Sequence, residues 1–413
     1  MIPKFSTTSI SPAEFLVDFA LANEACLLDE SFTADWPAMK QWCTLDGRPN
    51  FEHLLNTYGE AQVPVLIGAL NIEHCGYTTL TLRKFVERFI QPKNRETIAY
   101  LKDWHFQNQF PDSHVYKLPC FLAMDWINGE EWTNKTDNFL SGDYRFVYFG
   151  TAGSWTPFHA DVMESFSWSA NVCGRKQWYL LRRGAERHFL VDGASTKDAF
   201  ITDLRERRDR WLKAGLIEFV QKPGEIVFVP SGWYHQVYNL DDTISINHNV
   251  INACNVNFLR VFVERRLGDV QREIADLKEQ LTSIEFAVEC QKILLADCRM
   301  NMCVLDAFMN AVLASRGGAD ALALLSHTGD DALANAVTTL AGDLNARPPN
   351  TDALSLFKRA LLAACECSNG GDDCTKMNGQ FCAHCARIWG AFERARADAV
   401  KRSLSAYLLE NGE

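Results

Sequence analysis

The stretch from residue 144 to residue 249 has the pattern of a series of short strands, and it constrains the fold more than any other part of the chain. Apolar and β-branched runs are separated there by turn sequences such as Cys-Gly-Arg-Lys, Lys-Pro-Gly-Glu and Pro-Ser-Gly. Many short strands without alternating helices predict an antiparallel double-sheet barrel, a double-stranded β-helix of the jelly-roll or cupin type. The predicted strands are Arg145–Phe149, Phe158–Val162, Phe166–Cys173, Gln177–Leu181, Ile217–Val220, Glu225–Val229, His235–Asn239 and Thr243–Val250.

The residues before this stretch predict helices and two further strands. Helical spacing of apolar residues occurs in 11–22 and, with breaks, in 36–58. Residues 63–67 and 97–104 have the pattern of strands, and a threonine cap between them begins a helix with an apolar stripe from Leu82 to Ile90. We therefore expect a mixed β and α protein with an N-terminal, mostly helical support region (1–62), a barrel domain (63–255) and a helical C-terminal region (256–413).

The C-terminal region contains a heptad-like spacing with two interpretations. It could form a dimerising seam, giving a homodimer through the C-terminal helices, or one helix packed on the barrel. The residues are Leu267, Val270, Ile274, Leu277, Leu281, Ile284 and Val288. Within the barrel, the charged segment 197–215 contains Arg-Glu-Arg-Arg-Asp-Arg, which predicts a solvated helix.

Composition excludes several classes of protein. The net charge of −11 argues against a partner that needs a broad basic surface, so we expect no direct binding of nucleic acid. The first residues lack the pattern of a secretory signal, and no apolar run is long enough to span a membrane. We therefore expect a cytoplasmic protein, with the nucleus left open, whose 14 cysteines are mostly reduced.

His159 and Asp161 form a His-x-Asp pair on a predicted strand, where alternate side chains point to the same face. A second histidine, His235, follows a Pro-Ser-Gly turn that leads into another strand. Two imidazoles and one carboxylate form the facial triad of non-haem iron(II) sites, which leaves coordination positions for 2-oxoglutarate and O2. Lys176, if buried, would need an anion such as the far carboxylate of that co-substrate.

These motifs resemble the JmjC (jumonji C) family of Fe(II)- and 2-oxoglutarate-dependent oxygenases. The segments that carry the resemblance are GSWTPFHAD, SWSANVCGRKQW and GEIVFVPSGWYHQVYNLDDTISINHN, and the likeness extends from about Val63 to Asn255. It is greatest to the small JmjC hydroxylases, and within them to the subgroup that hydroxylates a lysine of the eukaryotic peptide-chain release factor at its fourth carbon. The resemblance thus implies a protein lysyl hydroxylase with that factor as its partner.

The resemblance also assigns roles to individual residues. It makes His159, Asp161 and His235 the iron ligands, and Lys176 the partner of the far carboxylate of 2-oxoglutarate. Thr156 and Tyr100 match residues that hydrogen-bond the same carboxylate, and Asn247 aligns with a polar residue near the metal-binding end of the co-substrate. Three aromatic residues are candidates for the cavity wall, although core packing explains them as well: Phe146, Tyr148 and Trp178.

Three alternatives stay open at this stage. The same iron chemistry could serve an N-methyl-lysine or arginine demethylase, and a catalytically silent JmjC scaffold could bind partners through the C-terminal half. A separate cluster near the C-terminus could hold zinc through thiolates, or could be a set of reduced thiols. Its members are Cys365, Cys367, Cys374, Cys382, His384 and Cys385.

Overall fold

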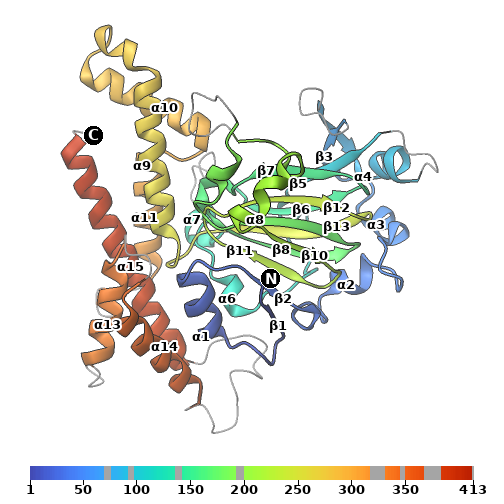
Figure 1. Ribbon diagram of the computed structural model, residues 1–413, viewed down its shortest axis with the longest axis horizontal. Helices are drawn as coiled ribbons and strands as arrows, with labels where there is room; N and C mark the ends of the chain where they lie inside the picture. The colour runs from blue at the N-terminus through green and yellow to red at the C-terminus, as the bar shows by residue number, and fades with distance from the viewer. Residues whose placement is uncertain are drawn as a thin grey trace.

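The strands form two sheets that face each other in the computed structural model, which describes residues 1–68, 76–91, 97–134, 142–191, 200–316, 331–344, 349–366 and 383–411 (Figure 1). Within the described residues, the larger sheet has nine strands in the order β1 (Lys4–Phe5), β2 (Cys26–Leu28), β11 (Ile226–Val229), β8 (Phe166–Cys173), β13 (Thr243–Val250), β6 (Arg145–Gly150), β5 (Ala99–Trp104), β3 (Gln62–Ile67) and β4 (Gly76–Thr81). The smaller sheet has the order β10 (Ile217–Gln221), β9 (Lys176–Leu181), β12 (Tyr234–Asn239) and β7 (Trp155–His159). The double-sheet barrel predicted from the turn pattern is confirmed.

One predicted strand was misplaced, and the difference affects the candidate site. Residues 158–162 were expected to be extended as one strand, but β7 begins at Trp155 and ends at His159. Pro157 lies within β7, which is tolerated because this strand is at the edge of the smaller sheet. Asp161 therefore lies beyond the strand, and its position depends on the turn that follows.

Helices precede, interrupt and follow the barrel. In the N-terminal part, α1 continues as a π-helix over Phe15–Leu21, and α4 as a π-helix over Val86–Ile90 that carries the predicted buried stripe. The helices before and within the barrel are α1 (Pro12–Glu14), α2 (Pro37–Gln41), α3 (Phe51–Tyr58), α4 (Leu82–Phe85), α5 (Phe106–Gln109), α6 (Cys120–Ala123), α7 (Glu130–Thr133) and α8 (Trp211–Ala214). Thr81 caps α4 as predicted, because its hydroxyl accepts a hydrogen bond from the Lys84 amide.

The C-terminal helices lie together on one side of the sheets (Figure 1). They are α9 (Val256–Glu273), α10 (Ser283–Cys298), α11 (Met302–Ser315), α13 (Asp331–Gly342), α14 (Thr351–Glu366) and α15 (Ala383–Asn411). One continuous cluster of buried apolar side chains includes Phe15, Val147, Leu259 and Phe392, which come from all three expected regions. The helical region is therefore packed against the barrel and is part of the same core.

The heptad-like stretch is not one helix, so both sequence interpretations were wrong about its shape. The chain leaves the helix after Glu273, passes through a 3-10 turn over Ala275–Glu279 and begins α10 at Ser283. Leu267 is fully buried in the core, whereas Ile284 is 78% exposed. Because the chain changes direction between α9 and α10, the seven apolar residues do not form one continuous stripe. A homodimer through these helices stays a prediction.

Two other expectations concern the periphery of the fold. The segment before Gly215 forms a 3-10 turn over Leu204–Arg210 and then α8, so it is helical in part, as expected. Of the proposed zinc cluster, the structure describes only the side chain of Cys385, which is buried and donates to the Leu361 carbonyl. The other five side chains lie outside the described residues.

Substitutions in the heptad-like stretch should distinguish its buried residues on α9 from its exposed residues on α10. We expect Leu267→Ala to lower the free energy of unfolding by about 2–5 kcal/mol, because it leaves a cavity in a fully buried position. Ile284→Ala should change it by less than about 0.5 kcal/mol, since the side chain is exposed. Urea denaturation at one fixed protein concentration measures both values. Equal large losses would mean that Ile284 is buried, as a continuous seam requires.

Candidate active site

Two histidines face each other across neighbouring strands of the smaller sheet. β7 and β12 are antiparallel, and their register pairs His159 directly with His235. The two ring centroids are 4.3 Å apart, and Trp178 on β9 stacks on His235 with centroids 5.6 Å apart. A register shift between His235 and Val237 marks a bulge beside the pair, a feature that often re-aims side chains next to active sites.

Each histidine is oriented by a backbone carbonyl two residues before it. Nδ1 of His159 lies 2.7 Å from the Pro157 oxygen, and Nδ1 of His235 lies 3.3 Å from the Trp233 oxygen. A carbonyl can only accept, so Nδ1 donates in both rings and Nε2 is the nitrogen that faces away from the carbonyl. Burial, together with His235, lowers the pKa of His159 to about 3, so its imidazole is neutral at pH 7.

Asp161 is brought to the histidines by a strained turn. It precedes a 3-10 turn over Val162–Glu164, in which Met163 and Glu164 have φ values of 57° and 49°. Ser167 at the start of β8 donates a 2.7 Å hydrogen bond to Oδ2 of Asp161. Ligand atoms of Asp161, His159 and His235 lie within 4.8 Å of one another.

The turn after Asp161 is held by the C-terminal region. Glu164 is buried and accepts from Arg183 at 2.6 Å and from Arg265 at 2.9 Å. Arg265 belongs to α9, so a helix outside the barrel stabilises the conformation that positions the third candidate ligand. Two non-glycine residues with positive φ cost free energy, and these ion pairs help to offset it.

All seven site residues expected from the sequence line a single cavity of about 520 Å³ between the two sheets. They are Tyr100, Thr156, His159, Asp161, Lys176, His235 and Asn247. The three aromatic residues expected as cavity walls, Phe146, Tyr148 and Trp178, line it as well. The barrel therefore brings together residues that are far apart in the sequence.

Lys176 is a buried amine in this cavity, with 2% of its surface exposed. Its Nζ donates to Ser245 Oγ at 2.6 Å, and among the described residues it forms no ion pair. Burial lowers the pKa of Lys176 to about 7. A buried ammonium without a protein carboxylate favours an anionic ligand in the cavity.

Three polar side chains of the larger sheet, Tyr100, Asn247 and Ser169, add hydrogen-bonding groups to the same cavity. Side-chain hydrogen bonds connect Tyr100 with Thr156 and Asn239, and burial raises the pKa of Tyr100 to about 12, so its hydroxyl stays a donor. The Asn247 Oδ1 and Ser169 Oγ atoms have no hydrogen-bond partner among the described residues. Their strands pair so that Asn247 is opposite Ser169, and both side chains line the cavity. Orphaned polar atoms of this kind indicate a ligand-binding position.

The sequence did not identify Ser167 and Ser245, which hold Asp161 and Lys176. The sequence contains a signal for one of these two serines, Ser245. Ser245 precedes Asn247 by two positions on β13, so strand periodicity places both on the same face. Ser167 had no such signal, because its role depends on the turn that brings Asp161 to the start of β8.

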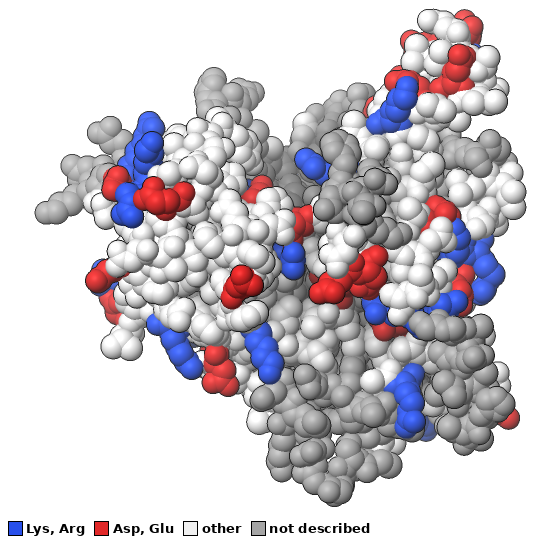
Figure 2. All heavy atoms as spheres, turned by 180° about the vertical axis from the view of Figure 1, so that it is seen from behind, with Lys and Arg blue, Asp and Glu red and all other residues white. Residues whose placement is uncertain are grey.

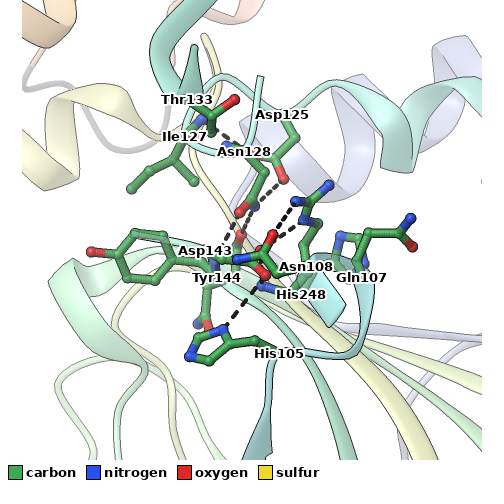
Figure 3. Close-up of polar contacts among 12 residues, drawn as sticks. His105, Gln107, Asn108, Asp125, Ile127, Asn128, Thr133, Asp143, Tyr144 and His248 are labelled. Atoms are coloured by element: carbon green, nitrogen blue, oxygen red, sulfur yellow. Dashed lines mark hydrogen bonds and ion pairs between the residues drawn. The ribbon is translucent and has the colours of Figure 1, made fainter. Parts of the chain in front are cut away.

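A second polar network supports the cavity wall around Tyr144 (Figure 3). Asn128 donates to Asp125 and accepts from the Tyr144 amide at 2.9 Å. Asp143, which also lines the cavity, accepts from Arg145 at 2.7 Å and lies 3.5 Å from His105. This carboxylate is therefore already paired with the Arg145 guanidinium.

Comparisons with known proteins agree with the geometry. Residues 146–250 match the family model described as JmjC domain, hydroxylase. The chain belongs to the JmjC family of 2-oxoglutarate- and iron-dependent oxygenases. It is 41% identical over 301 residues to the 2-oxoglutarate and iron-dependent oxygenase JMJD4 of Gallus gallus, covering 69% of this chain and 68% of that protein.

Further relatives carry two different descriptions. The 2-oxoglutarate and iron-dependent oxygenase JMJD4 of Homo sapiens is 41% identical over 298 residues, with 69% of each chain covered. The arginine-specific demethylase JMJ20 of Arabidopsis thaliana is 34% identical over 316 residues, covering 73% of this chain and 68% of that protein.

The charge on the surface and the character of the helices both bear on what the protein can contact. On the face shown in Figure 2, acidic and basic side chains are interspersed. None of the helices in the described part of the chain has the length and apolar character needed to span a membrane.

Binding of 2-oxoglutarate should weaken as the pH rises above 7. The ligand-free Lys176 has a pKa of about 7 and must be protonated to pair with a carboxylate. Below pH 7 the amine is already charged and affinity should be constant, whereas above pH 7 affinity should fall toward about tenfold per pH unit. Calorimetry with the Mn(II)-loaded protein between pH 6.5 and 8.5 measures this. Lys176→Met is the control, with weak binding and a flat profile; a wild-type profile that is equally flat would contradict the pairing.

Proposed function

We propose that this protein is an Fe(II)- and 2-oxoglutarate-dependent hydroxylase that modifies a lysine side chain of the eukaryotic translation termination (release) factor. The observation that carries the reaction type is the grouping of His159, Asp161 and His235 around one point of a cavity that also contains the buried Lys176. The choice of lysine and of the release factor rests on the resemblance carried by the SWSANVCGRKQW and NLDDTISINHN segments. An encounter with that factor would occur in the cytoplasm.

The residues fit the metal. Iron(II) would be held by His159, His235 and the carboxylate of Asp161, a two-histidine, one-carboxylate set that leaves positions open, with Nε2 as the ring nitrogen not used by the backbone carbonyls. The carbonyl partners of both Nδ1 atoms and the Ser167 hydroxyl are the outer contacts that orient metal ligands. When bound, iron(II) with 2-oxoglutarate and O2 supplies the oxidising power for inserting oxygen into an unactivated C–H bond.

The chain's own groups have three tasks. Lys176 binds the far carboxylate of 2-oxoglutarate, with Thr156 and Tyr100 as hydroxyl donors to the same group. Asn247 on β13 lies opposite Ser169 on β8, and its side-chain amide, whose oxygen Oδ1 has no partner among the described residues, is assigned to the metal-binding end of the co-substrate. Aromatic walls formed by Phe146, Tyr148 and Trp178 exclude water from the reacting atoms.

A second candidate is an arginine demethylase, because the Arabidopsis thaliana relative carries that description. Hydroxylation of an N-methyl group followed by loss of formaldehyde uses the same cavity and co-substrate. The two functions therefore differ in the substrate carbon that is presented, and the product distinguishes them.

Two substitutions should affect different kinetic constants. We expect His159→Ala to reduce 2-oxoglutarate decarboxylation to background, because it removes a metal ligand, while the circular dichroism spectrum stays unchanged. Lys176→Ala should raise the KM for 2-oxoglutarate by about 10- to 100-fold, since it removes hydrogen bonds to a charged group. Succinate formation at varied co-substrate concentration provides both constants. Activity retained in His159→Ala, or an unchanged KM in Lys176→Ala, would remove that residue from its role.

Mass spectrometry of treated proteins tests the substrate. The full chain is incubated with Fe(II), 2-oxoglutarate and recombinant release factor, and separately with a peptide containing N-methyl-arginine. We expect a lysine of the release factor to gain the mass of one oxygen atom, and the peptide to keep its methyl group. The His159→Ala variant is the matched control. Methyl loss without lysine oxidation would assign the demethylase instead, and turnover of neither would leave the scaffold interpretation.

A further inference from the structure

Asp103 has an unusual backbone conformation in the wall of the cavity. It lies on β5, where the pairing with β6 shifts register between Leu101 and Trp104, so Lys102 and Asp103 form a bulge. Its φ of 62° is in the left-handed region, which non-glycine residues other than asparagine and aspartate rarely adopt. A bulge changes the direction of a side chain, and Asp103 lines the cavity as a result.

Among the described residues that line the cavity, Asp103 is a carboxylate without a cationic partner. Its Oδ1 accepts a 2.9 Å hydrogen bond from the neutral Tyr148 hydroxyl. Asp143 is paired with Arg145 and His105, and Asp161 belongs to the histidine cluster. Lys102 is adjacent in sequence and also lines the cavity, but within the described chain it forms no ion pair with Asp103.

The neighbours of Asp103 connect it with the reacting end of the cavity. Tyr148 donates a hydrogen bond to Asp103, and its ring centroid lies 6.0 Å from that of Tyr100. The charge of Asp161 contributes to the raised pKa of Tyr148. Ser169 is 5% exposed and lines the same cavity, and its hydroxyl has no hydrogen-bond partner among the described residues. This hydroxyl is therefore available to a ligand in the cavity. A lysine that presents a carbon of its chain near the histidine cluster carries its ammonium a few bonds further, and that charge needs a carboxylate.

We propose that Asp103 is a specificity-determining residue that binds the protonated amine of the substrate side chain, with the Tyr148 hydroxyl fixing the carboxylate. This inference rests on the proposed function, since it names the group that recognises the lysine. The carboxylate selects a cationic side chain over a neutral one of equal length, because only the cation replaces the interactions with water that both partners lose.

Two variants test Asp103 while preserving the fold. Asp103→Asn is isosteric, tolerates the positive φ and keeps an acceptor for Tyr148, so it removes only the charge. Asp103→Gly removes the side chain and suits the left-handed backbone better than aspartate does. Asp112→Asn, a change at an exposed carboxylate outside the cavity, is the matched control.

The measured quantity is the ratio of kcat/KM for two peptides. Both contain the release-factor segment in which mass spectrometry finds the oxidised lysine, and one has 2-aminoheptanoic acid, a neutral residue of equal side-chain length, in place of that lysine. We expect the wild type and Asp112→Asn to share one preference for lysine, and both Asp103 variants to reduce that preference by about 10- to 100-fold. A preference unchanged in both Asp103 variants would overturn the proposal.

A second probe separates this inference from the proposed function. n-Pentylammonium and 1-pentanol are compared as ligands of the protein loaded with diamagnetic Zn(II) and 2-oxoglutarate, by saturation-transfer NMR. Binding of the ammonium that is lost in Asp103→Asn supports the role of Asp103 even if the release factor is not oxidised, which would sink only the proposed function. Equal binding of the ammonium by wild type and Asp103→Asn contradicts the role of Asp103, whatever the substrate protein is.

Discussion

The pairing of β7 with β12 is the constraint on which the rest of the site depends. Because the register sets His159 opposite His235, two imidazoles converge at the edge of the smaller sheet without any long-range adjustment. Each ring is then fixed by a carbonyl of its own strand, two residues earlier. A register shift of one residue would turn one of the rings to the other face of the sheet. Backbone hydrogen bonds therefore determine the geometry of the two histidine donors.

The third member of that set depends on a different kind of support. Asp161 follows the end of β7, and the turn after it has two consecutive non-glycine residues in the left-handed region. Glu164 in this turn is held by Arg183 of the barrel and by Arg265 of α9. The C-terminal helical region thus has a direct structural connection to the site, in addition to sharing the hydrophobic core with the barrel.

The cavity is lined by a buried amine, Lys176, and by a carboxylate, Asp103, which come from different sheets. Lys176 has a lowered pKa because burial disfavours its charged form, and a carboxylate ligand would restore that charge. Asp103 lies on the larger sheet, on a bulge of β5, and offers a carboxylate to the same space. An anionic co-substrate and a cationic substrate side chain can therefore be recognised by separate residues from opposite sheets.

The sequence by itself determined the strand-rich barrel and the C-terminal helical region, and motif likeness identified the seven expected residues that line the cavity. It did not predict β1 and β2, which the N-terminal part contributes to the larger sheet. Strand periodicity and turn residues are local properties, and motif likeness needs no coordinates. Only the tertiary structure decided that Asp161 lies beyond its strand, that the heptad-like stretch is split between α9 and α10, and that Asp103 is turned into the cavity. These features depend on contacts between segments far apart in the chain, such as Arg265 with Glu164, and on a bulge whose position is fixed by the partner strand. Local patterns carry no information about such contacts, because the free energy that stabilises a strained turn comes from residues elsewhere in the fold.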